Sequence, residues 1–98
     1  MKNLMALALF GLMLLHPHTG WAQNKMYWTD SGTDKIQRAN LDGTSVEDLV
    51  TTGLSVPFGI ALDVAAGKMY WIDAGTDKIQ RANLDGSSVE DLVTGLNF

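Results

Sequence analysis

The stretch Lys25-Met26-Tyr27-Trp28-Thr29-Asp30 returns 43 residues later as Lys68-Met69-Tyr70-Trp71-Ile72-Asp73. The segment that follows it, GTDKIQRANLDG at 32–43, returns without change at 75–86. Across the whole duplicated stretch, 25–50 against 68–93, only three of 26 positions differ. A repeat of about 40–45 residues built from short strands is typical of a β-propeller blade, and such a unit cannot bury both of its faces alone.

The second copy divides into four short strands separated by turn residues. Its apolar and alternating runs predict extended segments at 58–64, 68–73, 78–84 and 89–93. Asp85-Gly86 is a favoured pair for the turn before the last strand. Four strands joined in sequence form an antiparallel meander, so the predicted fold class is all-β, with antiparallel four-stranded blades.

The first copy begins at Lys25, which predicts second, third and fourth strands but no first strand. We expect blade 1 at about 25–53 and blade 2 at about 54–96, which is slightly less than two blades. The segment 45–50 also fits one helical turn capped by Ser45. A segment this short forms no stable isolated helix, so its place in the meander favours an outer strand.

Residues 1–22 differ in character from the repeats and resemble a secretory signal peptide. Lys2 supplies a positive charge, and the apolar run from Leu4 to Leu15 is shorter than the about 20 residues that a membrane span needs. Small residues at Gly20 and Ala22 predict cleavage after Ala22. The alternative is an uncleaved amphipathic or membrane anchor. The predicted product has no membrane span after cleavage and is secreted, either periplasmic or extracellular.

The composition excludes several kinds of chemistry. The chain has 7 Lys and Arg against 11 Asp and Glu, a net charge of −4, which argues against nucleic acid as a partner. It has no cysteine, and its two histidines, His16 and His18, lie in the predicted signal peptide. The mature chain would therefore lack the side chains of Ser-His-Asp and Cys-His sites and of common zinc sites. We predict no catalytic residue, no metal and no cofactor.

The remaining polar candidates each have a structural and a functional interpretation. The carboxylates that flank the turns after the duplicated motif could hold Ca²⁺ or act as acid and base: Asp30 with Asp34, and Asp73 with Asp77. Their recurrence in both copies favours a role in the turns. Arg38 and Arg81 could face a ligand, but pairing with acidic neighbours or exposure to solvent is favoured. The motif aromatics could line a carbohydrate or peptide site, but packing is favoured.

These segments resemble the YWTD repeat, also called the low-density lipoprotein receptor class B repeat. Tyr27-Trp28-Thr29-Asp30 matches the motif fully, and Tyr70-Trp71-Ile72-Asp73 departs at one position. Pro57-Phe58-Gly59-Ile60-Ala61-Leu62-Asp63 is similar to the first strand of the family's blade. The resemblance implies two blades of a six-bladed β-propeller, incomplete alone. It also implies structural roles in packing and in tying strands together for six residues: Tyr27, Trp28, Asp30, Tyr70, Trp71 and Asp73.

The function predicted from these features is an exported, noncatalytic protein-interaction module of YWTD repeats, either a fragment or self-assembling. A homo-oligomer of three chains would supply six blades. The sequence identifies no protein or peptide ligand and no binding residue. The alternative is a hydrolase or lactonase whose carboxylate- or metal-dependent site forms on an assembled propeller, because fold does not dictate function.

Overall fold

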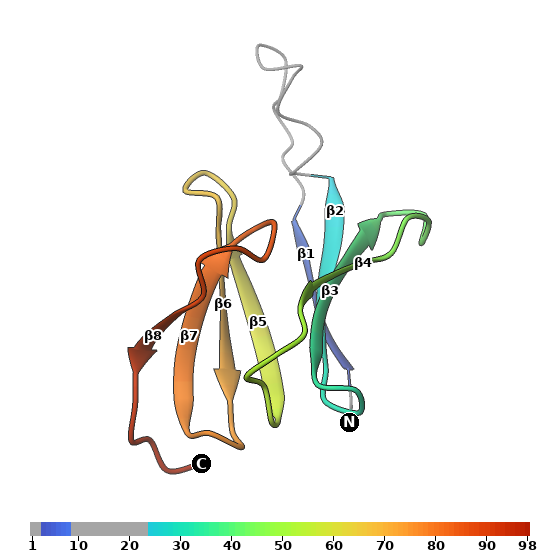
Figure 1. Cartoon of the computed structure of the whole chain (residues 1–98). Coiled ribbons are helices and arrows are strands. Elements are labelled where there is room, and N and C mark those ends of the chain that lie inside the picture. The colour runs from blue at the N-terminus through green and yellow to red at the C-terminus, as the bar shows by residue number, and fades with distance from the viewer. Residues whose placement is uncertain (1–2, 9–23) are drawn as a thin grey trace.

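Two four-stranded antiparallel sheets stand next to each other (Figure 1). The computed structural model describes residues 3–8 and 24–98, and these contain no helix long and apolar enough to cross a membrane. The first sheet has the order β1 (Asn3–Ala8), β2 (Lys25–Asp30), β3 (Lys35–Asn40), β4 (Glu47–Val50). The second has the order β5 (Pro57–Asp63), β6 (Lys68–Asp73), β7 (Lys78–Asn83), β8 (Glu90–Val93).

The four strands predicted for the second copy are confirmed, and no strand end shifts by more than one residue. The sheet order follows the chain order in both sheets, as a meander requires. The duplicated segment 45–50 contains the strand β4 and not a helical turn. Its pairing with β3 includes the same irregularity, at Ile36/Gln37, that β7 and β8 show at Ile79/Gln80.

The prediction that the first copy has no first strand is wrong. Strand β1 pairs antiparallel with β2, from Asn3 opposite Asp30 to Ala8 opposite Lys25. An exposed strand edge offers free N–H and C=O groups, and an apolar segment of the same chain satisfies them here. Strand β1 lies within the predicted signal peptide. The predicted cleavage position after Ala22 lies outside the described residues, so the signal peptide stays a prediction.

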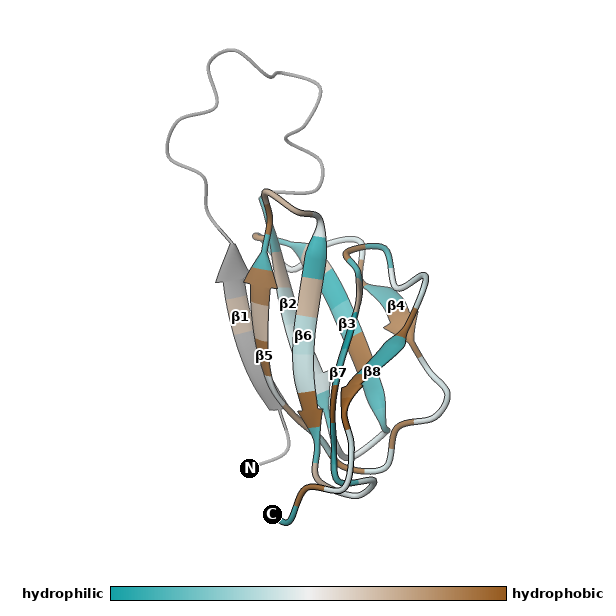
Figure 2. Cartoon of the chain, turned by 90° about the vertical axis from the view of Figure 1, so that its left-hand side faces the viewer, coloured by the Kyte–Doolittle hydropathy of each residue, from teal (hydrophilic) through white to brown (hydrophobic). Residues whose placement is uncertain are grey.

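The core lies between the two sheets. Strand β5 is largely apolar and lies next to β1 and β2 (Figure 2). From the first sheet, the core receives Tyr27, Ile36 and Val50. From the second sheet, it receives Met69, Trp71, Ala82 and Leu84. Each sheet therefore buries one face against the other sheet, as stacked blades do.

Candidate functional site

The duplicated motif presents opposite faces to the core in the two sheets. In β2 the side chains of Tyr27 and Thr29 are fully buried, while Trp28 between them is half-buried. In β6 the pattern is reversed, because Trp71 and Asp73 are buried while Tyr70 is half-buried. Adjacent residues of a strand point to opposite faces. The structure therefore brings Tyr27 and Trp71 into one core cluster and leaves Trp28 and Tyr70 on the outer faces.

We name the two faces of a blade by the residues that recur in both copies. The front face of blade 1 carries Tyr27, Ile36, Arg38 and Val50, and that of blade 2 carries their repeats Tyr70, Ile79, Arg81 and Val93. The back face of blade 2 carries Met69, Trp71, Asp73, Gln80, Ala82 and Leu84, and that of blade 1 carries Met26, Trp28, Asp30, Gln37, Ala39 and Leu41. In this chain the front face of blade 1 packs against the back face of blade 2.

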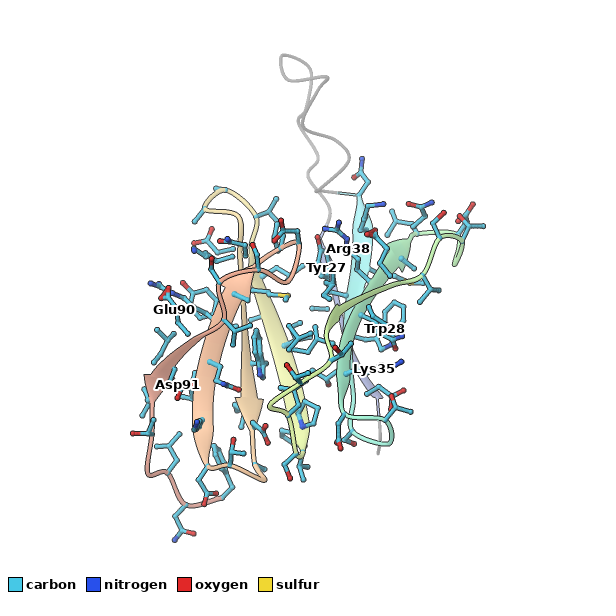
Figure 3. The ribbon with its side chains drawn as sticks, viewed as in Figure 1. Tyr27, Trp28, Lys35, Arg38, Glu90 and Asp91 are labelled. Carbon is cyan, nitrogen blue, oxygen red and sulfur yellow. The ribbon has the colours of Figure 1, made fainter. Side chains whose placement is uncertain are left out.

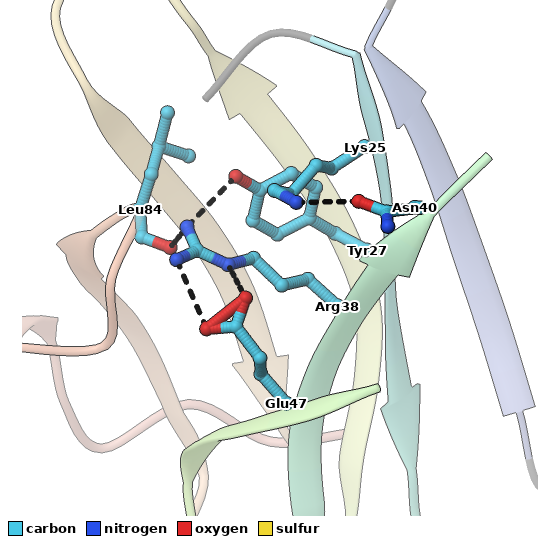
Figure 4. Close-up of polar contacts among 6 residues, drawn as sticks. All are labelled: Lys25, Tyr27, Arg38, Asn40, Glu47 and Leu84. Carbon is cyan, nitrogen blue, oxygen red and sulfur yellow. Dashed lines mark hydrogen bonds and ion pairs between the residues drawn. The ribbon is translucent and has the colours of Figure 1, made fainter. Parts of the chain in front are cut away.

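Arg38 connects the two faces at their contact (Figure 4). Its Nη1 donates to the main-chain carbonyl of Leu84 at 2.9 Å and to the Tyr27 hydroxyl at 3.4 Å. Its Nε and Nη2 donate to the two carboxylate oxygens of Glu47, at 3.1 and 3.3 Å. Burial acts to lower the pKa of Arg38, but the hydrogen bonds to Glu47 and Tyr27 outweigh it and raise this pKa. The guanidinium is therefore a permanently charged bridge between the blades.

Asp73 ties the segment that joins the two sheets to the turn that follows β6. Its carboxylate accepts from the backbone N–H groups of Ser55 and Val56, at 2.9 and 2.8 Å, in the segment that joins the two sheets. It also accepts from Gly75 at 3.0 Å in its own turn. Burial acts to raise the pKa of Asp73, but these backbone donors outweigh it and lower the pKa. Its repeat, Asp30, accepts from two backbone N–H groups of its own turn, at 2.9 and 3.2 Å.

A third set of contacts lies within each blade and is the same in both. Trp28 Nε1 donates to Gln37 Oε1 at 3.1 Å, and Gln37 Nε2 donates to Asp48 Oδ1 at 2.7 Å. Lys35 Nζ completes the chain with a 3.0 Å bond to Asp48 Oδ2. In blade 2 the matching distances are 3.1, 2.8 and 2.9 Å. These bonds join the second, third and fourth strands of each sheet and use the indole N–H groups of the motif tryptophans.

The other carboxylates proposed for chemistry lie in turns. Asp34 and Asp77 both have a φ of 58°, in the left-handed region that Asp tolerates better than most residues. In residues 3–8 and 24–98, no three His, Cys, Asp or Glu side chains gather in a group that could hold a metal ion.

Figure 3 shows Tyr27 and Arg38 on the side of the first sheet that faces the second, with Glu90 and Asp91 on the opposite flank of the second sheet. The predicted pairing of Arg38 with an acidic neighbour is confirmed by Glu47. The alternative of exposure to solvent is wrong, because Arg38 is only 7% exposed. The Leu84 carbonyl was not predicted as a partner of Arg38. A main-chain acceptor leaves no signal in the sequence.

These two sheets, with aligned repeats and an interface of unlike faces, define consecutive blades of a β-propeller. The sequence model of the family described as "Low-density lipoprotein receptor repeat class B" matches residues 24–64 and 67–96. The chain belongs to this family of repeats. The predicted family is thereby confirmed.

Individual relatives match over a single repeat or slightly more. The chain is 51% identical over 47 residues to mouse low-density lipoprotein receptor-related protein 5, which is 48% of this chain and 3% of the relative. It is 40% identical over 42 residues to nidogen of Drosophila melanogaster, which is 43% of this chain and 3% of the relative. This chain therefore corresponds to a few per cent of the length of these relatives.

The spatial arrangement of the sheets also has a solved counterpart. The chain is similar to one in the crystal structure of a nidogen/laminin complex, with a TM-score of 0.69 and 38% sequence identity. The match covers 72% of this chain and 28% of that chain. The likeness spans both sheets, so it supports the stacking of the two blades as well as the fold of each.

Proposed function

We propose that this protein is an exported, noncatalytic module that binds other proteins through YWTD propeller blades. The observation that carries the proposal is the family match to both repeats together with their packing as consecutive blades. The similar solved structure is described as a complex of nidogen with laminin, so a related propeller occurs in a protein–protein complex. Its ligand does not transfer to this chain, because ligand recognition depends on surface residues and not on the fold.

The noncatalytic part of the proposal is supported by how the carboxylates are used. Asp30 and Asp73 accept backbone N–H groups, and Asp48 and Asp91 accept from Gln and Lys side chains. These bonds recur at matching positions of both blades, as expected for groups that maintain the blade. We therefore propose structural roles for all six motif residues: Tyr27, Trp28, Asp30, Tyr70, Trp71 and Asp73.

We propose that residues 1–22 act as a signal peptide and that the product is extracellular or periplasmic. The short apolar run, its flanking charge and the small residues at 20 and 22 support this. Relatives that match are receptor-related proteins and nidogen. Strand β1 would then belong only to the uncleaved chain, and the edge of β2 would be free after cleavage.

The two outer faces of the blade pair need cover, since a blade in a ring is packed on both sides. We propose that this cover comes either from further repeats of a longer chain or from other copies of this chain. Three copies would supply the six blades that the family resemblance implies.

Export and the absence of catalysis are tested separately. Fusion of a periplasmic reporter to the C-terminus should give activity that is lost when Leu9 is replaced by Arg, and the mass of the exported chain should begin at Gln23. The purified chain should hold no stoichiometric metal after dialysis and should not hydrolyse ester or lactone substrates. Bound Ca²⁺ at one per chain, with lactone hydrolysis that a chelator abolishes, would instead establish the hydrolase alternative. Laminin is a suitable first protein probe for binding.

A further inference from the structure

The two copies are nearly identical in sequence but differ sharply in exposure, and the differences follow the faces. On the back face, Leu84 of blade 2 is 6% exposed, while its repeat Leu41 of blade 1 is 44% exposed. On the front face, Val50 of blade 1 is 5% exposed, while its repeat Val93 of blade 2 is 42% exposed. The exposed back face of blade 1 therefore carries the same residues as the buried back face of blade 2. The exposed front face of blade 2 likewise matches the buried front face of blade 1.

The repeated lysines Lys35 and Lys78 lie away from the interface between the blades, and their exposure is nearly equal in the two copies. The side chains of Lys35 and Lys78 are 35% and 32% exposed, whereas those of Arg38 and Arg81 are 8% and 34% exposed. The differences at Leu41/Leu84, Val50/Val93 and Arg38/Arg81 therefore identify the back face of blade 1 and the front face of blade 2 as the two open faces. These two faces are complementary, because their counterparts already pack together inside this chain.

We propose that a second copy of this chain docks its open back face on the open front face of the first copy, head to tail, and repeats the internal interface. This inference rests on the proposed function as an interaction module and specifies its partner. A head-to-tail contact leaves one open face at each end, so it continues until rotation closes a ring. Three copies complete the six blades that the family resemblance implies.

The internal interface predicts the contacts between copies. Arg38 donates to the Leu84 carbonyl inside the chain, so Arg81 should donate to the Leu41 carbonyl of the next copy. Asp73 accepts from Ser55 and Val56, which follow Leu54. Asn97 and Phe98 follow Leu96 in the same way, so their N–H groups should meet Asp30 of the next copy.

The turn glycine that recurs in both copies shows the same difference, because the other blade approaches closely at Gly86 but not at Gly43. A Cβ added to Gly86 would collide with the main-chain oxygen of Leu49 in blade 1. Its repeat, Gly43, has the same φ of 88° but nothing within 4 Å, because no blade covers it in the single chain. In the proposed assembly, Gly43 would lie against the Leu92 oxygen of the preceding copy, where no side chain fits.

Sedimentation equilibrium of the full chain tests the proposal, over roughly 1 to 100 µM, a range that resolves weak and moderate association. We expect a species of three times the 10.6 kDa monomer mass. A folded monomer throughout this range would overturn the proposal, as would a dimer that does not grow, because a closed two-fold contact is not head to tail.

Two variants with matched controls locate the interface. Gly43→Ala should weaken association about tenfold or more, while Gly67→Ala, with a φ of 70° and nothing within 4 Å, should carry similar backbone strain and leave association unchanged. Arg81→Ala should weaken association similarly, while Lys78→Ala should not. Far-ultraviolet circular dichroism confirms that each variant is folded. Equal effects of a variant and its control would contradict the assigned faces.

Mixing the two weakened variants tests the direction of the contact. The Gly43→Ala chain keeps an intact front face, and the Arg81→Ala chain keeps an intact back face. At equal concentration they should form a one-to-one dimer that neither forms alone, and a mixture that stays monomeric would overturn the head-to-tail order. Failure of this proposal is distinguishable from failure of the proposed function, because export and metal content do not depend on self-association.

Discussion

Arg38 Nη1 donates a 2.9 Å hydrogen bond to the main-chain carbonyl of Leu84, 46 residues further along the chain, and so joins the two blades directly. The same guanidinium is held by both oxygens of Glu47. Burying an ion pair favours the fold only when its remaining polar groups are satisfied. The carbonyl of Leu84 helps to meet this requirement, because it accepts a hydrogen bond from Arg38 Nη1 inside the interface.

Replacement of Arg38 by Ala should destabilise the chain by about 2–3 kcal/mol, because it leaves a buried carbonyl unsatisfied and breaks a charged hydrogen bond. Arg38→Lys should recover only part of this loss, because an ammonium lacks the fork that holds Glu47 and Leu84 together. Urea unfolding provides the measurement. Lys35→Ala, which removes only an exposed ion pair with Asp48, should change stability by less than about 1 kcal/mol. A similar effect of both alanine variants would contradict the bridge.

Thr29 is fully buried, and its hydroxyl has no hydrogen-bond partner among the described residues. The second copy has Ile at this position, Ile72. Thr29→Val keeps the shape and removes the unsatisfied hydroxyl, so it should stabilise the chain by about 1 kcal/mol. The thermal midpoint and the urea midpoint should both rise. Thr33→Val, in an exposed turn, is the control and should have little effect; a destabilised Thr29→Val chain would show that the hydroxyl is satisfied in solution.

Gly86 and Gly43 allow steric fit and backbone strain to be separated, because both have a φ of 88°. Gly43→Ala should cost about 1 kcal/mol from backbone strain alone in the monomer. Gly86→Ala adds a collision with the backbone of Leu49, so it should cost at least about 2 kcal/mol more. Urea unfolding below the association range, with loss of tryptophan fluorescence as the signal, measures the difference. Equal losses would mean that the blades do not approach closely at this turn.

Asp73 should make stability depend on pH in the acid range. Its pKa is lowered in the folded chain, since backbone donors outweigh burial, so its ionised form stabilises the fold above the ordinary carboxyl value of 3.8. This contribution should be lost as the pH falls below 3.8 and through the lowered pKa of the folded chain. Asp73→Asn should be less stable than the wild type at pH 7, and the gap should narrow towards pH 2. Urea unfolding at each pH is the measurement, and a gap that stays constant down to pH 2 would contradict this role of the Asp73 carboxylate.

Strand β1 should protect the edge of β2. A chain that begins at Gln23 lacks β1, so the backbone amides of β2 should lose about tenfold or more of their protection from hydrogen exchange. Strand β6 is the internal control, because its neighbour β5 remains in the shortened chain. Exchange followed by mass spectrometry on peptides from both strands gives the comparison. Unchanged protection of β2 would mean that β1 does not pair with it in solution.

The sequence predicted the blade type well because its signals are local. Gly86 is a turn residue in the structure, and the aromatic and branched residues of 68–73 form a strand as predicted. The alternating segment predicted at 78–84 is a strand at 78–83. The prediction that the first copy has no first strand was wrong. The strand that pairs with β2 comes from residues 3–8, where the composition indicated a signal peptide. Pairing between distant segments depends on an unpaired edge, which sequence pattern does not reveal.

The amino-acid pattern alone was enough to predict that this chain is all-β, that it carries two YWTD repeats, and that each repeat forms a strand meander. Which face of each repeat is buried followed only from the packing of one sheet against the other. Arg38 and Arg81 occupy identical local sequences, yet one bridges two blades and the other lies on an open face. The burial of a side chain depends on what packs against it. The front face of blade 1 meets blade 2, whereas the same face of blade 2 meets no further blade in this structure, so identical residues are buried in one copy and exposed in the other.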